Sequence, residues 1–254
     1  MRRGRARRPA PGGERSRTTV LEVARRLGRV FGLPRPFRAT LRAAPQGRPN
    51  GRQRRHGSAL EVLVHGVLSQ NTSDVNSAHA FDSLMARFGG YDAIADAPVS
   101  AIAASIRSGG LAQMKAPRLK RMLREIRDTA PNMDLDRFLA QMSDQEARRY
   151  LTSINGVGIK TASVVLLFAM GRKVFPVDTH VYRVSKRLGW IGAGVSREKA
   201  HVVLEPMIPP RHRYSVHINL IRHGRETCHA QRPECAACVL NDICPSAFLF
   251  DGEE

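Results

Sequence analysis

The sequence predicts an all-α protein, and two observations lead to that prediction. Almost every segment after residue 17 spaces its apolar residues three or four positions apart, as on one face of a helix. Alternation of apolar and polar residues, which is typical of half-buried strands, is nearly absent. With 254 residues, 42% of them hydrophobic, the chain is long enough for one or two compact domains with cores of their own.

The first helix is expected close to the N-terminus. Thr19 and Glu22 have the spacing of a capping box, and Gly32 followed by Pro34 ends the apolar pattern. Residues 1–17 are rich in Arg, Pro and Gly, a composition that buries little apolar surface. We expect them to form a disordered basic arm.

A core domain is expected to begin after a loop at residues 33–57. Ser58 and Glu61 repeat the capping-box spacing, Gly89 closes the next helix, and Pro98 opens a third. Further helical stretches are expected at 119–126, 134–142, 145–153, 159–170, 179–188, 197–207 and 211–223.

The charge of the chain is strongly positive, with 41 Lys and Arg against 22 Asp and Glu, a net of +19. Residues 1–57 carry a net of +15 and the remainder +4, so the excess lies near the N-terminus. A polyanion such as nucleic acid is the partner that this charge favours. The longest nearly unbroken apolar stretch, residues 162–170, is about half of a membrane span. We therefore expect no membrane contact and a cytoplasmic, nucleoid-associated protein of bacterial type.

A turn between two helical stretches is the first candidate binding site. Gly156 and Gly158, on either side of Val157, can adopt backbone angles closed to other residues and so aim amides at a phosphate. An ordinary helix corner with glycines for close packing is the alternative. Lys160 follows in the first helical turn, where the helix dipole and apolar neighbours should favour a neutral amine. It could equally reach a phosphate as a point charge.

Asp178 stands just before the next helix. As its N-cap it would accept the first backbone amides, a common role for Asp. A carboxylate in that position can also face an amine and a developing positive charge, and the two roles are compatible.

The four cysteines lie within 17 residues. Cys228, Cys235, Cys238 and Cys244 have the spacing C-x6-C-x2-C-x5-C, and thiolates in an unexported chain suit an iron–sulfur cluster or zinc. A structural zinc site usually has two C-x-x-C pairs, whereas this chain has one. The spacing leaves both metals open.

Taken together, the segments 154–162 (INGVGIKTA) and 177–180 (VDTH) and the cysteine spacing resemble the helix-hairpin-helix (HhH-GPD) DNA glycosylases, in particular the endonuclease III branch. The resemblance covers about residues 58–247. It implies two helical domains flanking a DNA-binding groove: a six-helix barrel with the hairpin at 58–172, and an iron–sulfur cluster domain. The latter would combine residues 18–57 and 173–247, followed by an acidic tail at 248–254.

The resemblance also implies an activity and its residues. The expected function is excision of oxidised pyrimidines from damaged duplex DNA by a monomer, with cleavage of the strand by β-elimination. Lys160 would attack the sugar and Asp178 would assist. His180, which belongs to the DNA-binding set, would orient Asp178; a purely structural role is the alternative for this histidine. The four cysteines would bind a structural [4Fe–4S] cluster, and Arg232 on their loop would contact the DNA backbone.

Base removal requires the nucleotide to leave the stack. By position, Asn71 would fill the vacated space, with Gln70 adjacent, and Leu111 would be the apolar wedge. Loop capping is the alternative for Asn71, and burial is the alternative for Leu111. Asp74 would cap the next helix.

Two departures from the family pattern keep other functions open. The family has glutamine where this chain has Asn71, and proline where it has Asn155. A glycosylase for mismatched uracil or thymine is therefore one alternative. A divergent DNA-binding paralogue with little turnover is the other, although Lys160 and Asp178 together argue against it.

Overall fold

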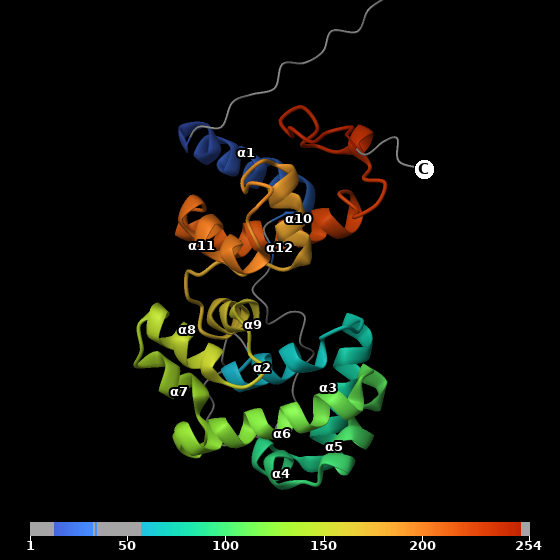
Figure 1. The fold of residues 1–254 in the computed structure, drawn as a ribbon, viewed down its shortest axis with the longest axis vertical. Helices are drawn as coiled ribbons and strands as arrows, with labels where there is room; N and C mark the ends of the chain where they lie inside the picture. The colour runs from blue at the N-terminus through green and yellow to red at the C-terminus, as the bar shows by residue number, and fades with distance from the viewer. Residues whose placement is uncertain (1–12, 33, 35–56, 250–254) are drawn as a thin grey trace, which may run out of the picture. The chain divides into compact units, whose positions relative to one another are not determined.

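The structure is a computed structural model of the chain, and it describes residues 13–32, 34 and 57–249. Most of the expected basic arm and loop, and the end of the acidic tail, lie outside the described residues. Every regular element in the described part of the chain is a helix, as the sequence predicted (Figure 1). No described helix combines the length and the apolar character needed to cross a membrane.

The chain divides into two compact units. The central unit comprises residues 35–172, and the terminal unit combines residues 1–34 with residues 173–254. The terminal unit is thus assembled from both ends of the chain.

The central unit is organised around α2 (Ala59–Leu68), a helix that is apolar on nearly every side. Ser58 accepts a hydrogen bond from the Glu61 amide at 3.1 Å, which confirms Ser58 as the N-cap. Around α2 lie α3 (Asp74–Phe88), α6 (Ala112–Thr129), α7 (Leu135–Ala140), α9 (Ile159–Val164) and the π-helical turn η4 (Val165–Ala169). Such a helix is stabilised by burial on all faces. Figure 1 shows α2 running between α6 and α9.

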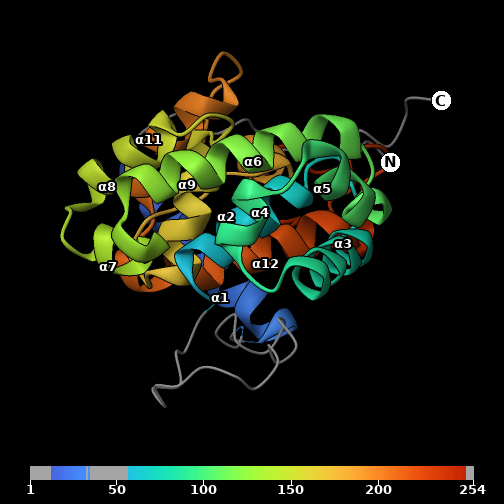
Figure 2. The same ribbon diagram turned by 90° about the horizontal axis from the view of Figure 1, so that it is seen from below.

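Three further helices complete the central unit. The short helices α4 (Tyr91–Asp96) and α5 (Val99–Ser105) pack on α6, and Figure 2 shows α6 with these two helices from below. A 3-10 turn, η2 (Arg107–Gly109), follows α5, and α8 (Asp144–Ser153) leads into the glycine turn. Helix α4 was not predicted from the sequence, because six residues are too few to display a helical period.

The terminal unit contains α1 (Gly13–Phe31), α10 (Thr179–Arg187), α11 (Arg197–Met207) and α12 (Arg213–Glu226), followed by the cysteine loop. Helices α1 and α10 both pack on α12. The core of this unit joins α1 to residues far along the chain. Its fully buried members include Val20, Val23, Leu27, Phe175, Val181, Leu204 and Leu220.

Two helix starts differ from the prediction. Helix α1 begins at Gly13, so Thr19 lies inside it and residues 13–17 are helical, not part of a disordered arm. Glu22 does not cap: its carboxylate accepts hydrogen bonds from Arg25 and Arg26, which lower its pKa to about 2. Helix α3 is capped by Ser73, whose hydroxyl accepts from the backbone one turn on, and Asp74 is its first residue.

Candidate active site and nucleic-acid interface

The glycine turn joins α8 to α9 in the central unit. Ile154 and Val157 are buried, and the Val157 amide donates to the Ile154 carbonyl at 3.0 Å. Gly156 has φ +86°, a left-handed conformation that disfavours any side chain. A Cβ at Gly156 would also lie 2.7 Å from Cδ of Arg118. Both the backbone and the packing therefore favour glycine at 156.

Gly158 is different, and here the prediction of unusual backbone angles was wrong. It is the N-cap of α9 with φ −86° and ψ 170°, which any residue can adopt. A Cβ at Gly158 would meet nothing within 4 Å, and the residue is exposed. What glycine provides at 158 is open space beside the first amides of α9. Phosphate binding at this turn stays a prediction.

Lys160 is the second residue of α9, and its side chain is exposed. Apolar neighbours in the central unit do not bury Lys160 as expected. The residues of α9 that turn inward are Ala162 and Ser163. The start of α9 is nevertheless fixed. Gly66 of α2 approaches so closely that a Cβ there would lie 3.0 Å from Cγ2 of Thr161. Lys160 is therefore an exposed amine at the closely packed start of α9.

Asp178 belongs to the terminal unit, where it is the N-cap of α10. Its Oδ1 accepts a hydrogen bond from the Val181 amide at 2.7 Å, which confirms the capping role. The side chain is half-buried. A carboxylate has room for further hydrogen bonds beside one cap contact, so the cap leaves Asp178 able to face a substrate.

Helix α10 also connects Asp178 to the cysteine loop. Arg183 donates to the carbonyls of Gly224 at 2.7 Å and Cys228 at 3.1 Å. It also lies 3.1 Å from Nδ1 of His180, so the recorded hydrogen bond of His180 is with Arg183 and not with Asp178. His180 packs tightly against Gly224. A Cβ added to Gly224 would lie 2.9 Å from the Cβ of His180.

Arg187, one turn further along α10, holds the beginning of the same loop. Its guanidinium donates to Sγ of Cys228 at 3.1 Å and to the carbonyls of His229 at 2.5 Å and Ala230 at 3.0 Å. Arg232, the predicted DNA contact, is exposed on this loop in a left-handed conformation, with φ +48°. The loop is thus anchored by α10 and presents Arg232 outward.

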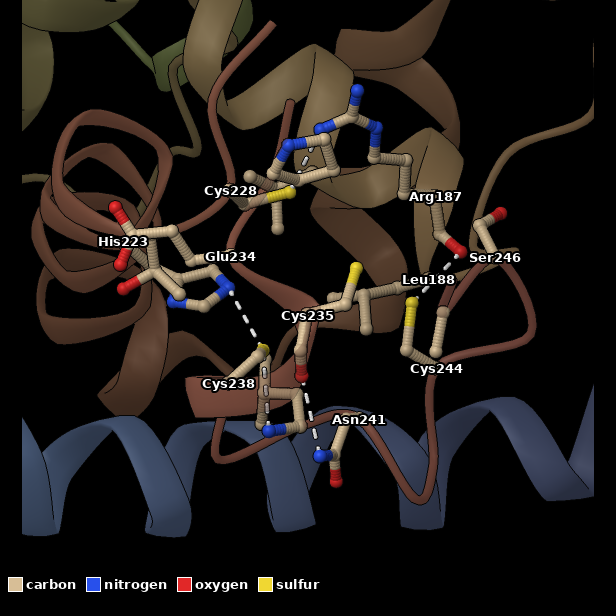
Figure 3. Close-up of a pocket in the computed structure, with 15 residues that line it drawn as sticks. Arg187, Leu188, His223, Cys228, Glu234, Cys235, Cys238, Asn241, Cys244 and Ser246 are labelled. Atoms are coloured by element: carbon tan, nitrogen blue, oxygen red, sulfur yellow. Dashed lines mark hydrogen bonds between the residues drawn. The ribbon is translucent and has the colours of Figure 1, made fainter. Parts of the chain in front are cut away.

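The four cysteines line one pocket (Figure 3). All four are free thiols and partly buried. Other lining residues are Arg187, Leu188 and His223. Among the described residues, no three His, Cys, Asp or Glu side chains are grouped so as to hold a metal ion.

Two of the sulfur atoms accept N–H donors. The Leu240 amide donates to Sγ of Cys238 at 3.4 Å, and Arg187 donates to Sγ of Cys228 at 3.1 Å. His223 Nε2 lies 3.7 Å from Sγ of Cys238. Donors of this kind stabilise metal-bound thiolates, and a set of thiols alone suits iron–sulfur clusters or zinc. By donor chemistry the four cysteines therefore suit either group, although their side chains are not drawn together as a ligand set in this structure.

Burial raises the pKa of the Cys238 thiol, and raises that of Cys244 to about 11. Since thiolates are the metal-binding form, binding at this pocket must release protons.

The two loops expected to enter DNA lie in the central unit. Asn71 and Leu111 are both exposed, and both have left-handed backbones, with φ +52° and +51°. The burial that was the alternative for Leu111 does not occur, since it is 48% exposed. Gln70 is half-buried and accepts a hydrogen bond from Arg118 at 2.5 Å.

Sequence reasoning missed four residues that hold these features in place: Arg183, Arg187, Arg118 and Lys115. The two α10 arginines carried a usable signal, since they lie four residues apart on one face of the helix that follows Asp178. Arg118 and Lys115 carried none, because Gln70 and Leu68, which they contact, lie more than 40 residues away along the chain.

Comparison with known proteins places this architecture in a family. Residues 64–210 match the HhH-GPD superfamily of base excision DNA repair proteins. Endonuclease III of Sulfolobus acidocaldarius is 35% identical over 189 residues, which are 74% of this chain and 82% of that protein.

Two solved structures have the same fold and 26% identity. A non-covalent endonuclease III–DNA complex has a TM-score of 0.70, and a trapped endonuclease III–DNA covalent intermediate has a TM-score of 0.72. Each covers 91% of this chain and 96% of the matched chain. The chain therefore belongs to the HhH-GPD superfamily of base excision DNA repair proteins.

Proposed function

We propose that this base excision repair glycosylase removes oxidised pyrimidines from duplex DNA and then cleaves the strand by β-elimination at the abasic site. The observation that carries the proposal is the placement of Lys160. It is an exposed primary amine in the first turn of α9, directly after the glycine turn and on a helix whose start is packed against α2. The similarity to a trapped covalent intermediate of endonuclease III with DNA supports a covalent route.

The chemistry follows from an amine nucleophile. The lone pair of the neutral Lys160 Nζ forms a bond to the anomeric carbon as the glycosidic C–N bond breaks; the electrons of the broken bond leave with the base, which takes up a proton from water. The new ammonium then loses a proton, and the ring oxygen takes one up as the sugar ring opens, which gives a Schiff base. Removal of a proton from the adjacent carbon then expels the 3′ phosphate, and water releases Lys160.

Asp178 is the group that we assign to assist these steps. A carboxylate can take the proton that Lys160 loses and can stabilise positive charge on the sugar. Its N-cap contact to Val181 at 2.7 Å fixes the side chain while leaving it partly exposed.

DNA binding is assigned to the amides at the start of α9, to Arg232 on the cysteine loop, and to the positive charge of residues 1–57. His180 and the Asn71 and Leu111 loops complete the set. We infer a monomer acting on damaged duplex in the cytoplasm.

We assign a [4Fe–4S] cluster to Cys228, Cys235, Cys238 and Cys244. The shared pocket and the N–H donors on the sulfurs support a metal group here. The resemblance of the cysteine segment to the cluster loop of the endonuclease III branch favours the iron–sulfur cluster over zinc. When bound, the cluster would cross-link the loop that presents Arg232. Iron and acid-labile sulfide in the purified protein test the assignment, and zinc without iron would contradict it.

Borohydride trapping on an abasic duplex tests the catalytic role of Lys160. We expect a covalent adduct with the wild type and with Lys199→Gln, a matched change at an exposed lysine of α11. Lys160→Gln should give no adduct. An adduct that still forms with Lys160→Gln would show that another residue is the nucleophile. Asp178→Asn should slow adduct formation by about 100-fold, in the range of general acid–base contributions.

Substrate preference is tested with duplexes that contain thymine glycol, mismatched uracil or mismatched thymine. Preference for thymine glycol supports the proposal. Because Asn71 is shorter than the family's glutamine, preference for a mismatched base is the specific alternative outcome. Binding with no cleavage of any substrate would identify a DNA-binding paralogue.

A further inference from the structure

Lys115 of α6 is a buried cation, with only 3% of its surface exposed. Its Nζ donates one hydrogen bond to the Leu68 carbonyl and one to the Gly109 carbonyl, both at 2.7 Å. Burying an ammonium is costly unless it is well paired, and burial lowers the pKa of Lys115. A lysine held in this way calls for a structural reason.

The two carbonyls come from the ends of different elements. Leu68 is the last residue of α2 and Gly109 is the last residue of η2. Carbonyls at helix ends lack partners within the helix, and a cation can satisfy them. A few residues beyond these ends stand the exposed Asn71 and Leu111. One ammonium therefore closes both elements that lead into the predicted insertion loops.

Gly109 allows η2 to pack closely against α3 and the end of α2. A Cβ at Gly109 would lie 3.0 Å from Cβ of Ala80 in α3 and 3.9 Å from the Leu68 carbonyl oxygen. η2 thus rests directly on α3 and on the end of α2. Both insertion loops are attached to one tightly packed region within the central unit.

We propose that Lys115 is a positioning residue that holds the Asn71 and Leu111 loops in a single fixed arrangement, so that both side chains enter the DNA together. The proposal rests on the proposed function insofar as these loops extrude the damaged nucleotide. Lys115 itself is buried and acts only through the two carbonyls. Because the loops are already fixed before DNA binds, no free energy is spent on ordering them when the base leaves the stack. The free-energy cost of extrusion is therefore lower.

The same helix provides a matched control. Lys120 donates to the carbonyls of Ala97 at 2.5 Å and Asp96 at 3.4 Å, where α4 ends. It thus makes the same kind of lysine-to-carbonyl contact, but to an element that does not lead into either loop. Lys115→Met and Lys120→Met each remove an ammonium and keep a side chain of similar length.

Amide hydrogen exchange on the full-length protein tests the structural half of the proposal without relying on activity. We expect Lys115→Met to speed exchange in residues 69–73 and 110–114 by about tenfold or more, the size of a lost buried hydrogen bond. Lys120→Met should leave both loops at the wild-type rate. Unchanged loop exchange in Lys115→Met would overturn the proposal.

Single-turnover kinetics test the functional half. Excision from a duplex should fall about tenfold or more in Lys115→Met, whereas cleavage of abasic single-stranded DNA, which needs no extrusion, should change less than about twofold. Equal losses on both substrates, or equal losses in the two lysine variants, would show a merely structural role. If the wild type excises no base, the proposed function fails, while the exchange result still decides the role of Lys115.

A second variant covers the case in which Lys115→Met does not fold. Gly109→Ala keeps the lysine and instead pushes η2 away from Ala80 by adding one methyl group. We expect the same pattern, with faster exchange in both loops and a selective loss of duplex excision. A stable Gly109→Ala protein with wild-type loops and duplex excision would contradict the proposal.

Discussion

Arg118 donates a hydrogen bond from Nη1 to Oε1 of Gln70 at 2.5 Å. The same arginine covers Gly156 of the glycine turn, where a Cβ would lie 2.7 Å from its Cδ. Arg118 therefore connects the loop after α2 with the turn before Lys160. The side chain of Gln70 is thus held by this hydrogen bond, whereas the neighbouring Asn71 is exposed.

This pairing predicts which residue fills the space left by the extruded base. Asn71→Ala should slow excision from a duplex by about tenfold, equivalent to about 1.4 kcal/mol. Gln70→Ala should have a smaller effect, because the Gln70 side chain is held by Arg118. Single-turnover excision of both variants measures this. A larger effect of Gln70→Ala would assign the gap-filling role to Gln70.

The two glycines of the turn should respond differently to alanine. Gly156→Ala introduces a side chain at φ +86° against Arg118 and should destabilise the protein by about 1–3 kcal/mol. Gly158→Ala meets no atom within 4 Å and should cost less than about 1 kcal/mol.

Gly158→Ala should nevertheless weaken DNA binding, because its methyl group occupies the open space beside the first amides of α9. Thermal unfolding and DNA titration separate the two effects. Normal DNA affinity in Gly158→Ala would count against a phosphate at this turn.

Arg187 should stabilise the cysteine loop. Arg187→Met removes three hydrogen bonds from that loop and should speed loss of the proposed cluster to a chelator, with a stability cost of about 1–3 kcal/mol for the unpaired carbonyls. The neighbouring exposed Lys186→Met is the control. The decay of visible absorbance measures cluster loss, and equal rates in the two variants would refute the role.

His65 should make stability depend on pH. Burial lowers the pKa of His65 from 6.5 to about 4, although Asp82 opposes the shift, and its ring stacks on Phe81 with centroids 3.9 Å apart. Because the unfolded chain takes up the proton more readily, this contribution is complete above pH 6.5 and is lost as the pH falls toward 4.

His65→Phe keeps the ring and removes the titration. Relative to this variant, the wild type should lose up to about 3 kcal/mol of unfolding free energy across that interval. Urea unfolding at a series of pH values provides the measurement. Parallel curves for the two proteins would show that His65 does not titrate in this way.

Residues 1–12 should contribute salt-sensitive affinity without taking part in the chemistry. They carry five arginines and precede α1. Deleting them should flatten the dependence of DNA affinity on salt, by at most about 4.5 in the logarithmic slope. Activity at saturating DNA should be unchanged. Loss of activity under that condition would give these residues a further role.

The sequence by itself determined the features that depend on neighbouring residues. Ser58 and Asp178 were identified as helix caps because a cap bonds to amides only three residues away. The all-helical class followed from apolar spacing. The cysteine spacing and the residues around Lys160 identified the family, since these motifs are contiguous segments of chain.

The tertiary structure decided everything that depends on a distant partner. Arg26 of α1 binds Asp242 from the far end of the chain, and the packing of α1 on α12 buries Val20, Val23 and Leu27. Lys115 is an ordinary helical lysine in the sequence, and only folding brings the Leu68 carbonyl to it. Long-range contacts leave no periodic trace in a sequence, because they are formed by packing between elements and not by the chain's local geometry.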